Sequence, residues 1–133
     1  MRVVIIGSGR LGSSLADVFS KRGDSVLVVD QNESKFIYIE DRERIEFLVG
    51  NSTDEKILRQ ALKKPADIVL VVTGNDYTNI MIAQKIKIID KTIRVIIRLF
   101  DKNLVSVYTE LGIEVLCPTS LTIEALLKMP GLS

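Results

Sequence analysis

Short apolar runs recur along the chain and alternate with segments whose apolar residues have helical spacing. The runs are rich in β-branched residues and lack polar alternation, which is typical of strands covered on both faces, as in a parallel sheet. Six strands are predicted, at 3–6, 26–29, 45–49, 68–72, 95–97 and 113–116. Right-handed crossovers between them predict an α/β, doubly wound parallel sheet in the order 3-2-1-4-5-6, with a flavodoxin-like order as the alternative.

The intervening segments carry helix signals. Leu11, Leu15, Val18 and Phe19 share one face of a first helix, and Gly23 is placed to end it. A short helix is predicted at 36–42, and a capping box at Ser52 to Glu55 is predicted to open a helix at 54–62. Asp76 and Asp101 are the predicted N-caps of helices at 77–89 and 102–111. Ser120 is the predicted N-cap of a final helix.

Composition narrows the class of protein. The 133 residues make one domain, and a net charge of +1 gives no basic field for nucleic acid. The longest aliphatic run is far shorter than the ~18 residues of a membrane span, so direct membrane insertion is not expected. One Cys and no signal-like segment predict a cytoplasmic protein, and the absence of His removes the commonest general base and zinc ligand. No metal site is predicted.

The segment Gly7-Ser8-Gly9-Arg10-Leu11-Gly12 matches the G-x-G-x-x-G pattern and lies between a predicted strand and a predicted helix. Gly7 permits the tight turn, Gly9 lets a pyrophosphate approach the backbone, and Gly12 lets the helix pack closely on the strand. The free N–H groups at the start of the helix then face the phosphates. This context predicts a Rossmann-like dinucleotide site rather than an empty turn.

The second predicted strand ends in an acid, Asp30, 18 positions after Gly12. Its carboxylate can accept hydrogen bonds from both hydroxyls of an adenosine ribose, and it repels a 2′-phosphate. Neither Gln31 nor Asn32 supplies a compensating cation. The residues therefore favour NAD or a plain adenine nucleotide over NADP.

Catalytic machinery is not evident. None of the three tyrosines begins a Tyr-x-x-x-Lys dyad, and the predicted strands and helices leave no room for a substrate domain. Cys117 lies in an apolar run before Pro118, where a small core residue is the usual role. Asp76 is interpreted as a helix cap rather than a cation ligand. The chain is predicted to bind a nucleotide without chemistry of its own.

Six ordered blocks of the sequence resemble the RCK, KTN or TrkA-N domains, the nucleotide-binding N-terminal lobes of potassium-transport regulators. The first block follows strand one, the second is the acid-ended close of strand two, and the third and fourth follow strands three and four. The last two are an Ile-Arg pair at the end of strand five and a Leu-Gly-Ile-Glu-Val stretch. They lie at 7–12, 28–30, 50–54, 73–79, 97–98 and 111–115, with Pro118 after them. The resemblance covers the whole chain, 1–133.

The resemblance implies a regulatory domain without enzyme activity that binds NAD(H), ATP, ADP or AMP. It also implies a homodimer or larger ring beneath a membrane ion-transport subunit, at the inner face of the membrane through that partner. The candidate ligand-binding residues follow the ends of the strands. They are Gly7, Ser8, Gly9, Arg10, Leu11, Gly12, Asp30, Gln31, Asn51, Ser52, Thr73, Gly74, Asn75 and Arg98.

Four details of the resemblance bear on the ligand. The family arginine at Arg10 reaches phosphates, although a solvated first-turn side chain is the alternative. Arg98 is either a phosphate ligand or a member of a surface ion pair. Asn51 stands where the family carries Asp, so its amide can accept from adenine N6 or donate instead. Thr119 stands where some members carry a cation-binding Glu, so regulation by a divalent ion is not implied.

The last predicted helix has apolar residues on more than one face. We expect 119–129 to contact a second copy of the chain, together with the helix at 102–111; the alternative is that it covers the edge of strand six. The expected function is a potassium-transport regulatory module switched by a nucleotide. A minimal or split NAD-dependent oxidoreductase is the alternative, and a redox or energy sensor unrelated to ion flux is a third interpretation.

Overall fold

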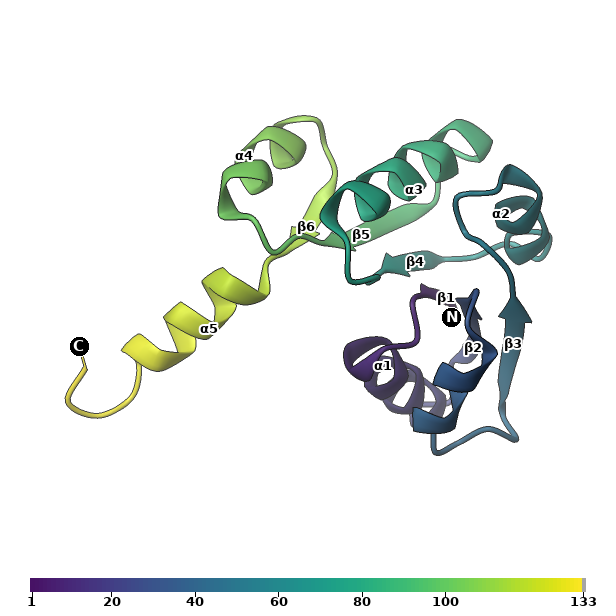
Figure 1. The fold of residues 1–133 in the computed structure, drawn as a ribbon, viewed down its shortest axis with the longest axis horizontal. Coiled ribbons are helices and arrows are strands. Elements are labelled where there is room, and N and C mark those ends of the chain that lie inside the picture. Colours follow the sequence, from purple (N-terminus) through teal and green to yellow (C-terminus); the bar gives the residue numbers. More distant parts are fainter. Residues whose placement is uncertain (133) are drawn as a thin grey trace.

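The computed structural model describes residues 1–132, which form one six-stranded sheet with all strands parallel (Figure 1). The strand order is β3-β2-β1-β4-β5-β6, which confirms the predicted doubly wound topology and excludes the flavodoxin-like order. The strands are β1 Arg2–Ile6, β2 Ser25–Asp30, β3 Ile45–Val49, β4 Ile68–Val71, β5 Arg94–Arg98 and β6 Glu114–Leu116.

The helices lie between the strands in sequence. They are α1 Arg10–Lys21, the 3-10 helix η1 Glu33–Tyr38, α2 Glu55–Ala61, α3 Asp76–Ile89, α4 Lys102–Glu110 and α5 Pro118–Leu127. Gly23 follows α1 with φ +90° and donates its N–H to the Ser20 carbonyl, as its predicted terminating role requires. Of the four apolar residues that share one face of α1, Leu11, Leu15 and Phe19 pack against the apolar layer, whereas Val18 is 55% exposed.

The starts of four helical segments differ from the sequence prediction. The short helix at 36–42 is instead η1, because the Asn32 side chain accepts the Ser34 N–H and begins the helix earlier. Asp54 rather than Ser52 caps α2, and Asn75 rather than Asp76 caps α3, each accepting a backbone N–H of the first turn. α5 begins before Ser120, at Pro118, because proline has the backbone geometry of a first helical residue. Asp101 caps α4 as predicted.

Alternate side chains of the central strands enter two apolar layers, one on each face of the sheet. Val3 and Ile5 pack on the face that α1 and η1 cover, while Val4 and Ile6 pack on the face that α2 and α3 cover. All four side chains are buried. Burial on both faces explains why these strands read as continuous apolar runs.

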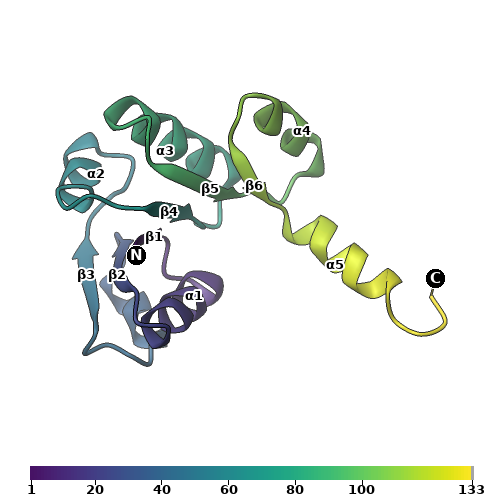
Figure 2. The same ribbon diagram turned by 180° about the vertical axis from the view of Figure 1, so that it is seen from behind.

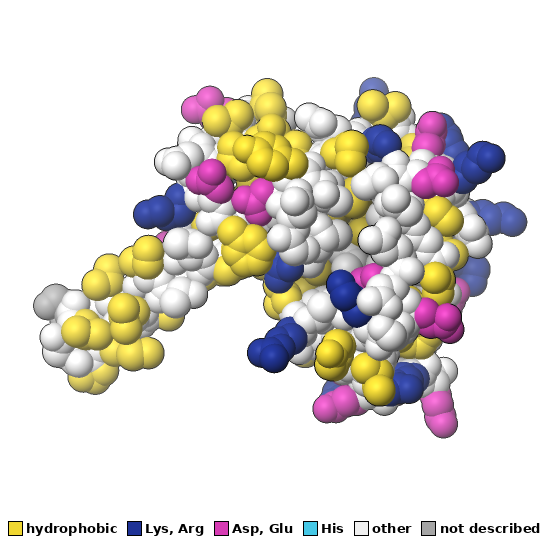
Figure 3. All heavy atoms as spheres, viewed as in Figure 1, with side chains coloured by type: hydrophobic (Ala, Val, Ile, Leu, Met, Phe, Trp, Pro, Cys, Tyr) yellow, Lys and Arg dark blue, Asp and Glu magenta, His cyan; other side chains and the backbone are white. Residues whose placement is uncertain are grey.

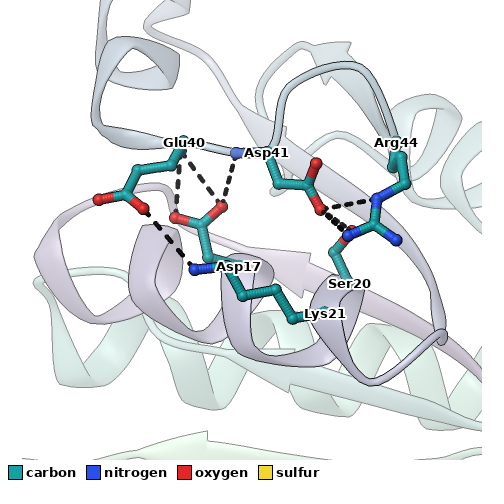
Figure 4. Close-up of polar contacts among 6 residues, drawn as sticks. All are labelled: Asp17, Ser20, Lys21, Glu40, Asp41 and Arg44. Carbon is teal, nitrogen blue, oxygen red and sulfur yellow. Dashed lines mark hydrogen bonds and ion pairs between the residues drawn. The ribbon is translucent and has the colours of Figure 1, made fainter.

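A cluster of polar contacts fastens α1 to the segment that leads from η1 to β3 (Figure 4). The carboxylate of Asp17 accepts the backbone N–H groups of Glu40 and Asp41 at 2.9 to 3.2 Å. The Asp41 carboxylate in turn accepts from Ser20 Oγ at 2.7 Å and from Arg44 Nε at 3.0 Å. These contacts fix the segment after η1 against the helix whose N-terminus borders the site described below.

α5 projects from the body of the molecule, and the two opposite views agree on this (Figures 1 and 2). No residue of α5 is buried, so this helix does not cover the edge of β6 as the alternative interpretation proposed. Its exposed apolar side chains are Leu121, Ile123, Leu126 and Leu127, followed by Met129. Across residues 1–132, no helix combines the length and apolar character that crossing a bilayer requires.

Candidate functional site

The glycine-rich loop between β1 and α1 is built by close backbone contacts. Gly7 has φ +104°, a left-handed conformation that favours glycine, and donates its N–H to the Val29 carbonyl at 2.9 Å. A Cβ at Gly12 would lie 1.8 Å from the carbonyl oxygen of Gly7. A Cβ at Gly9 would meet no described atom within 4 Å. Gly7 and Gly12 are therefore required by the fold, whereas Gly9 leaves open space in front of the loop.

The N-terminus of α1 faces this open space without a side-chain cap from any of residues 1–132. Gly9 is the N-cap, and the first backbone hydrogen bond that closes on it is from Ser13 N–H. The earlier N–H groups of the helix are left to a ligand or to solvent, and they carry the positive end of the helix dipole. This arrangement suits an anion such as a phosphate group.

Asp30 is 8% exposed and holds the glycine-rich loop as well as facing the site. Its Oδ2 accepts from Ser8 N–H at 2.9 Å and from Ser8 Oγ at 3.0 Å, and its Oδ1 accepts from Asn32 N–H at 2.8 Å. A carboxylate has about four acceptor positions, so roughly one remains, on Oδ1. Two ribose hydroxyls were expected on this carboxylate, whereas the structure leaves a place for one.

A cleft of about 420 Å³ crosses the carboxyl ends of the central strands, and we call it the carboxyl-end cleft. Ten of the predicted site residues line it. They are Gly7, Gly9, Asp30, Gln31, Asn51, Ser52, Thr73, Gly74, Asn75 and Arg98. The topology thus brings together residues from five separate strand ends, as expected for a doubly wound sheet.

The other four predicted site residues do not line the cleft. Ser8 is fully buried beneath it, where it donates to Asp30. Gly12 packs against Gly7, and Leu11 packs into the apolar layer on the α1 face. Arg10 is exposed in the first turn of α1, beside the loop, so its phosphate contact stays a prediction.

The cleft is also lined by residues that are not among the predicted site residues. The polar ones are Lys35 from η1, Thr53 after β3 and Thr78 from α3, and Gly50 lies with them. Gly50 and Thr53 adjoin selected residues, so their place after a strand was a usable signal. Lys35 carried no such signal, because the 3-10 helix that positions it was not predicted.

Arg98 is directed at the end of β4. Its guanidinium donates to the carbonyl oxygens of Val72 at 2.7 Å and Thr73 at 2.9 Å, and its Cζ lies 4.8 Å from the centre of the Phe100 ring. Burial lowers the pKa of Arg98, and the carboxylate of Asp76 partly offsets this. Within residues 1–132 the guanidinium joins no ion pair, so the surface ion-pair interpretation is not supported.

The Nε atom of Arg98 is buried and has no hydrogen-bond partner among the described residues. A buried donor without a partner is costly, and a positive charge without a counter-ion adds to that cost. Since Arg98 lines the carboxyl-end cleft, an acidic ligand there would supply the missing counter-charge. The residue therefore fits the phosphate-ligand interpretation.

Asn79, the last residue of the 73–79 block, organises the neighbouring strand ends, although it was not among the candidate ligand-binding residues. Its side chain is fully buried. The amide oxygen accepts from Thr73 N–H at 3.1 Å and from the Thr73 hydroxyl, and the amide nitrogen donates to the carbonyls of Thr73 and Arg98. One side chain thus joins the ends of β4 and β5, which fixes the positions of Thr73 and Arg98 in the cleft.

Asp76 does not cap α3, and its carboxylate contacts backbone N–H groups instead. Its two carboxylate oxygens accept the backbone N–H groups of Phe100 and Asp101, each at 2.9 Å, and so connect α3 to the loop after β5. In the part of the chain that the structure describes, no three acidic, Cys or His side chains lie close enough to hold a metal ion.

The sheet order, the glycine-rich loop and the cleft at the carboxyl ends define a Rossmann-like domain. The chain belongs to the TrkA-N domain family, whose family model matches residues 3–118. The Trk system potassium uptake protein TrkA of Streptomyces coelicolor is 28% identical over 128 residues, covering 96% of this chain and 57% of that protein. A TrkA homolog of Pyrococcus abyssi is 28% identical over 110 residues, covering 83% of this chain and 48% of that one. The chain spans about half the length of these relatives.

Solved structures show the same fold. The TrkA-N domain of the inner membrane protein YbaL from Escherichia coli superposes with a TM-score of 0.85 at 20% identity, covering 96% of this chain and 94% of that one. The GsuK RCK domain superposes with a TM-score of 0.79 at 25% identity, and the match covers 94% of this chain and 27% of that one. The AMP-bound C-terminal domain of Kef from Shewanella denitrificans superposes with a TM-score of 0.77 at 21% identity, and the match covers 95% of this chain and 80% of that one.

Proposed function

We propose that this chain is the nucleotide-binding regulatory module of a potassium-transport system, with NAD(H) or an adenine nucleotide in the carboxyl-end cleft. One observation carries the proposal. Two unsatisfied positive groups, the α1 N-terminus and Arg98, border a cleft whose remaining wall includes the Asp30 carboxylate. Phosphates fit the first two groups and a ribose hydroxyl fits the third.

The relatives support both parts of the proposal. The curated relatives are potassium uptake proteins. Among the structures of similar fold, Kef was solved with AMP and GsuK with NAD and with ADP. Their ligands share an adenosine phosphate, so the choice among them depends on what lies beyond the first phosphate. The regulatory role without catalysis is part of the proposal, and the likeness to potassium uptake proteins supports it.

The assembly is proposed from α5 and α4. Figure 3 shows apolar side chains along the projecting α5, and α4 has no buried residue and exposes Val107. Apolar surface of this extent on an isolated chain is typical of a contact surface. We propose that residues 119–129 and α4 form a homodimer contact, and that the dimer or a larger ring acts on the cytoplasmic side of a membrane ion-transport subunit.

The proposed ligand is tested by identifying what the protein binds. Mass spectrometry of the small molecule that co-purifies, followed by calorimetry with NAD, NADH, AMP, ADP and ATP, should show saturable binding of at least one nucleotide. Incubation with NADH and a panel of carbonyl compounds, followed by absorbance, distinguishes the alternative oxidoreductase function from the regulatory one. Turnover of NADH would favour the oxidoreductase, and binding without turnover favours the regulatory module.

A further inference from the structure

A second hollow lies toward the amino ends of the strands, away from the carboxyl-end cleft, and we call it the amino-end groove. Its volume of about 190 Å³ is less than half of the 420 Å³ of the carboxyl-end cleft, and the two share no lining residue. Three strands and the C-terminal part of α2 with the residues after it line the groove. The lining residues are Arg2, Leu27, Glu46, Phe47, Leu48, Gln60, Lys63 and Lys64. The size of the groove suits a ligand smaller than a nucleotide.

The amino-end groove carries a surplus of positive charge. Its lining includes three cations, Arg2, Lys63 and Lys64, and one carboxylate, Glu46, which leaves a surplus of two positive charges. The Glu46 carboxylate lies 3.4 Å from Nη1 of Arg2 and 3.9 Å from Nζ of Lys64. Both distances exceed the about 2.8 Å of a charge-assisted hydrogen bond. Among residues 1–132, Lys63 joins no ion pair, so the cations of the groove are only weakly neutralised.

Arg2 presents an unused hydrogen-bond donor in the groove. Its Nη1 donates to Ser25 Oγ at 3.2 Å and to Glu46 Oε1 at 3.4 Å. Its Nη2 makes no hydrogen bond to a described residue and, unlike Nε, is not buried. The carboxylate of Asp67 accepts the backbone N–H of Arg2 at 2.7 Å, but it forms no ion pair with the guanidinium. The guanidinium therefore offers a charged donor, at Nη2, to a ligand in the groove.

We propose that the amino-end groove binds a small phosphate-bearing anion, either inorganic phosphate or a small phosphate monoester. A phosphate monoester carries a charge of about −1.5 to −2 at pH 7, which matches the surplus of two positive charges, whereas a carboxylate supplies one. Arg2 donates to the phosphate from Nη2, and the exposed ammonium groups of Lys63 and Lys64 neutralise the rest of its charge. This site is separate from the proposed nucleotide site, because it lies toward the other ends of the strands.

The first test is a nuclear magnetic resonance titration of the unmodified chain with inorganic phosphate, at constant ionic strength maintained with chloride. Saturable shifts are expected for the Arg2 Nε–H group and for the backbone amides of Glu46, Lys63 and Lys64. Acetate should bind more weakly than phosphate, because it carries one charge. Glycerol 3-phosphate distinguishes the two sources of phosphate: a lower Kd than that of inorganic phosphate indicates a monoester, and a higher Kd indicates the free ion.

The second test changes the charge of the groove in both directions. The double variant Lys63→Gln/Lys64→Gln should raise the phosphate Kd about fivefold, and Glu46→Gln should lower it about threefold, as expected for charge contacts near the surface. A variant that loses its structure cannot bind phosphate more tightly, so the decrease in Glu46→Gln is specific to the site. Lys56→Gln/Lys91→Gln is the matched control, because both lysines are exposed and lie outside the groove and the cleft.

The control variant should keep the phosphate Kd of the unmodified chain. Shifts confined to residues of the carboxyl-end cleft would overturn the proposal, as would equal affinities for acetate and phosphate. An unchanged Kd in either Lys63→Gln/Lys64→Gln or Glu46→Gln would also overturn it. Failure of the chain to bind any nucleotide would contradict the proposed function but would leave this site intact, because no residue is common to the groove and the cleft.

Discussion

Ser8 donates two hydrogen bonds to one oxygen of Asp30, from its backbone N–H at 2.9 Å and from its hydroxyl at 3.0 Å. The residue that faces the proposed ribose thus also holds the loop that faces the proposed phosphates. Both residues are buried, so the carboxylate cannot turn away from the loop without leaving the Ser8 donors unpaired. Ribose recognition and loop geometry are therefore coupled through a single side chain.

Replacing Asp30 should weaken ligand binding and loosen the loop together. We expect Asp30→Ala to reduce the affinity for ADP by about 1–3 kcal/mol, because a ribose hydroxyl loses its charged acceptor. Calorimetry measures the affinity, and hydrogen exchange of the Ser8 amide reports the loop. Glu43→Gln, at an exposed carboxylate between η1 and β3, is the control for loss of one negative charge. Unchanged ADP affinity in Asp30→Ala would place the ligand elsewhere.

Two glycines of the loop should respond differently to alanine. In Gly12→Ala the new Cβ meets the Gly7 carbonyl, and backbone must move, so we expect a loss of at least about 2 kcal/mol in the free energy of unfolding. In Gly9→Ala the Cβ enters open space, so the fold should persist while nucleotide affinity falls at least tenfold. Chemical denaturation and calorimetry check the pair. Full affinity in Gly9→Ala would contradict the proposed approach of a diphosphate to this backbone.

Arg98 should contribute to binding through its charge. In Arg98→Met the carbonyls of Val72 and Thr73 lose a donor and the ligand loses a cation, so we expect ADP affinity to fall by about 1.5–3 kcal/mol. The salt dependence of the remaining affinity should also be weaker than in the unmodified chain. Titrations at low and high salt measure both. Equal salt dependence in the two proteins would show that Arg98 does not face the phosphates.

The projecting helix should hold two copies of the chain together. Light scattering of the chain at micromolar concentration is expected to give twice the 14.8 kDa mass, and Leu126→Asp is expected to give the monomer mass. The reason is that a carboxylate in an apolar contact carries a large desolvation cost. Ile88→Asp is the matched control, since Ile88 is 81% exposed on α3 and lies outside α4 and α5. A monomer for the unmodified chain would contradict the proposed dimer.

The contacts in Figure 4 should make stability depend on pH through Asp41. Hydrogen bonds from Arg44 and Ser20 hold the pKa of the Asp41 carboxyl below its ordinary value. A lowered pKa in the folded state means that the stabilisation is present above the ordinary aspartate value of about 4 and is lost as the pH falls below it. The Tm difference between the unmodified chain and Asp41→Asn should therefore be largest at neutral pH and shrink in acid. A difference that stays constant from pH 7 to pH 3 would exclude this contribution.

The sequence determined the strands, their order and most of the residues that line the cleft. Continuous β-branched runs such as 68–71 are typical of strands covered on both faces, and crossover handedness then leaves few topologies. The residues after each strand meet at the same edge of a parallel sheet, so Asp30, Asn51, Thr73 and Arg98 were identifiable from their positions alone. The spacing of apolar and polar residues over short stretches of the sequence is therefore enough to predict the strands and the residues at their carboxyl ends.

Tertiary contacts decided the rest. Several acceptors compete for the same N–H groups at a helix start, so the choice of Asp54 over Ser52 depends on the path of the chain from β3. Lys35 reaches the cleft because the segment after its 3-10 helix is fastened to Asp17, 18 residues earlier in the chain. α5 projects from the body of the molecule with no buried residue, and its apolar residues occur on too many faces for the pattern to specify one direction. These features depend on residues distant in sequence, whose contacts exist only once the chain has folded.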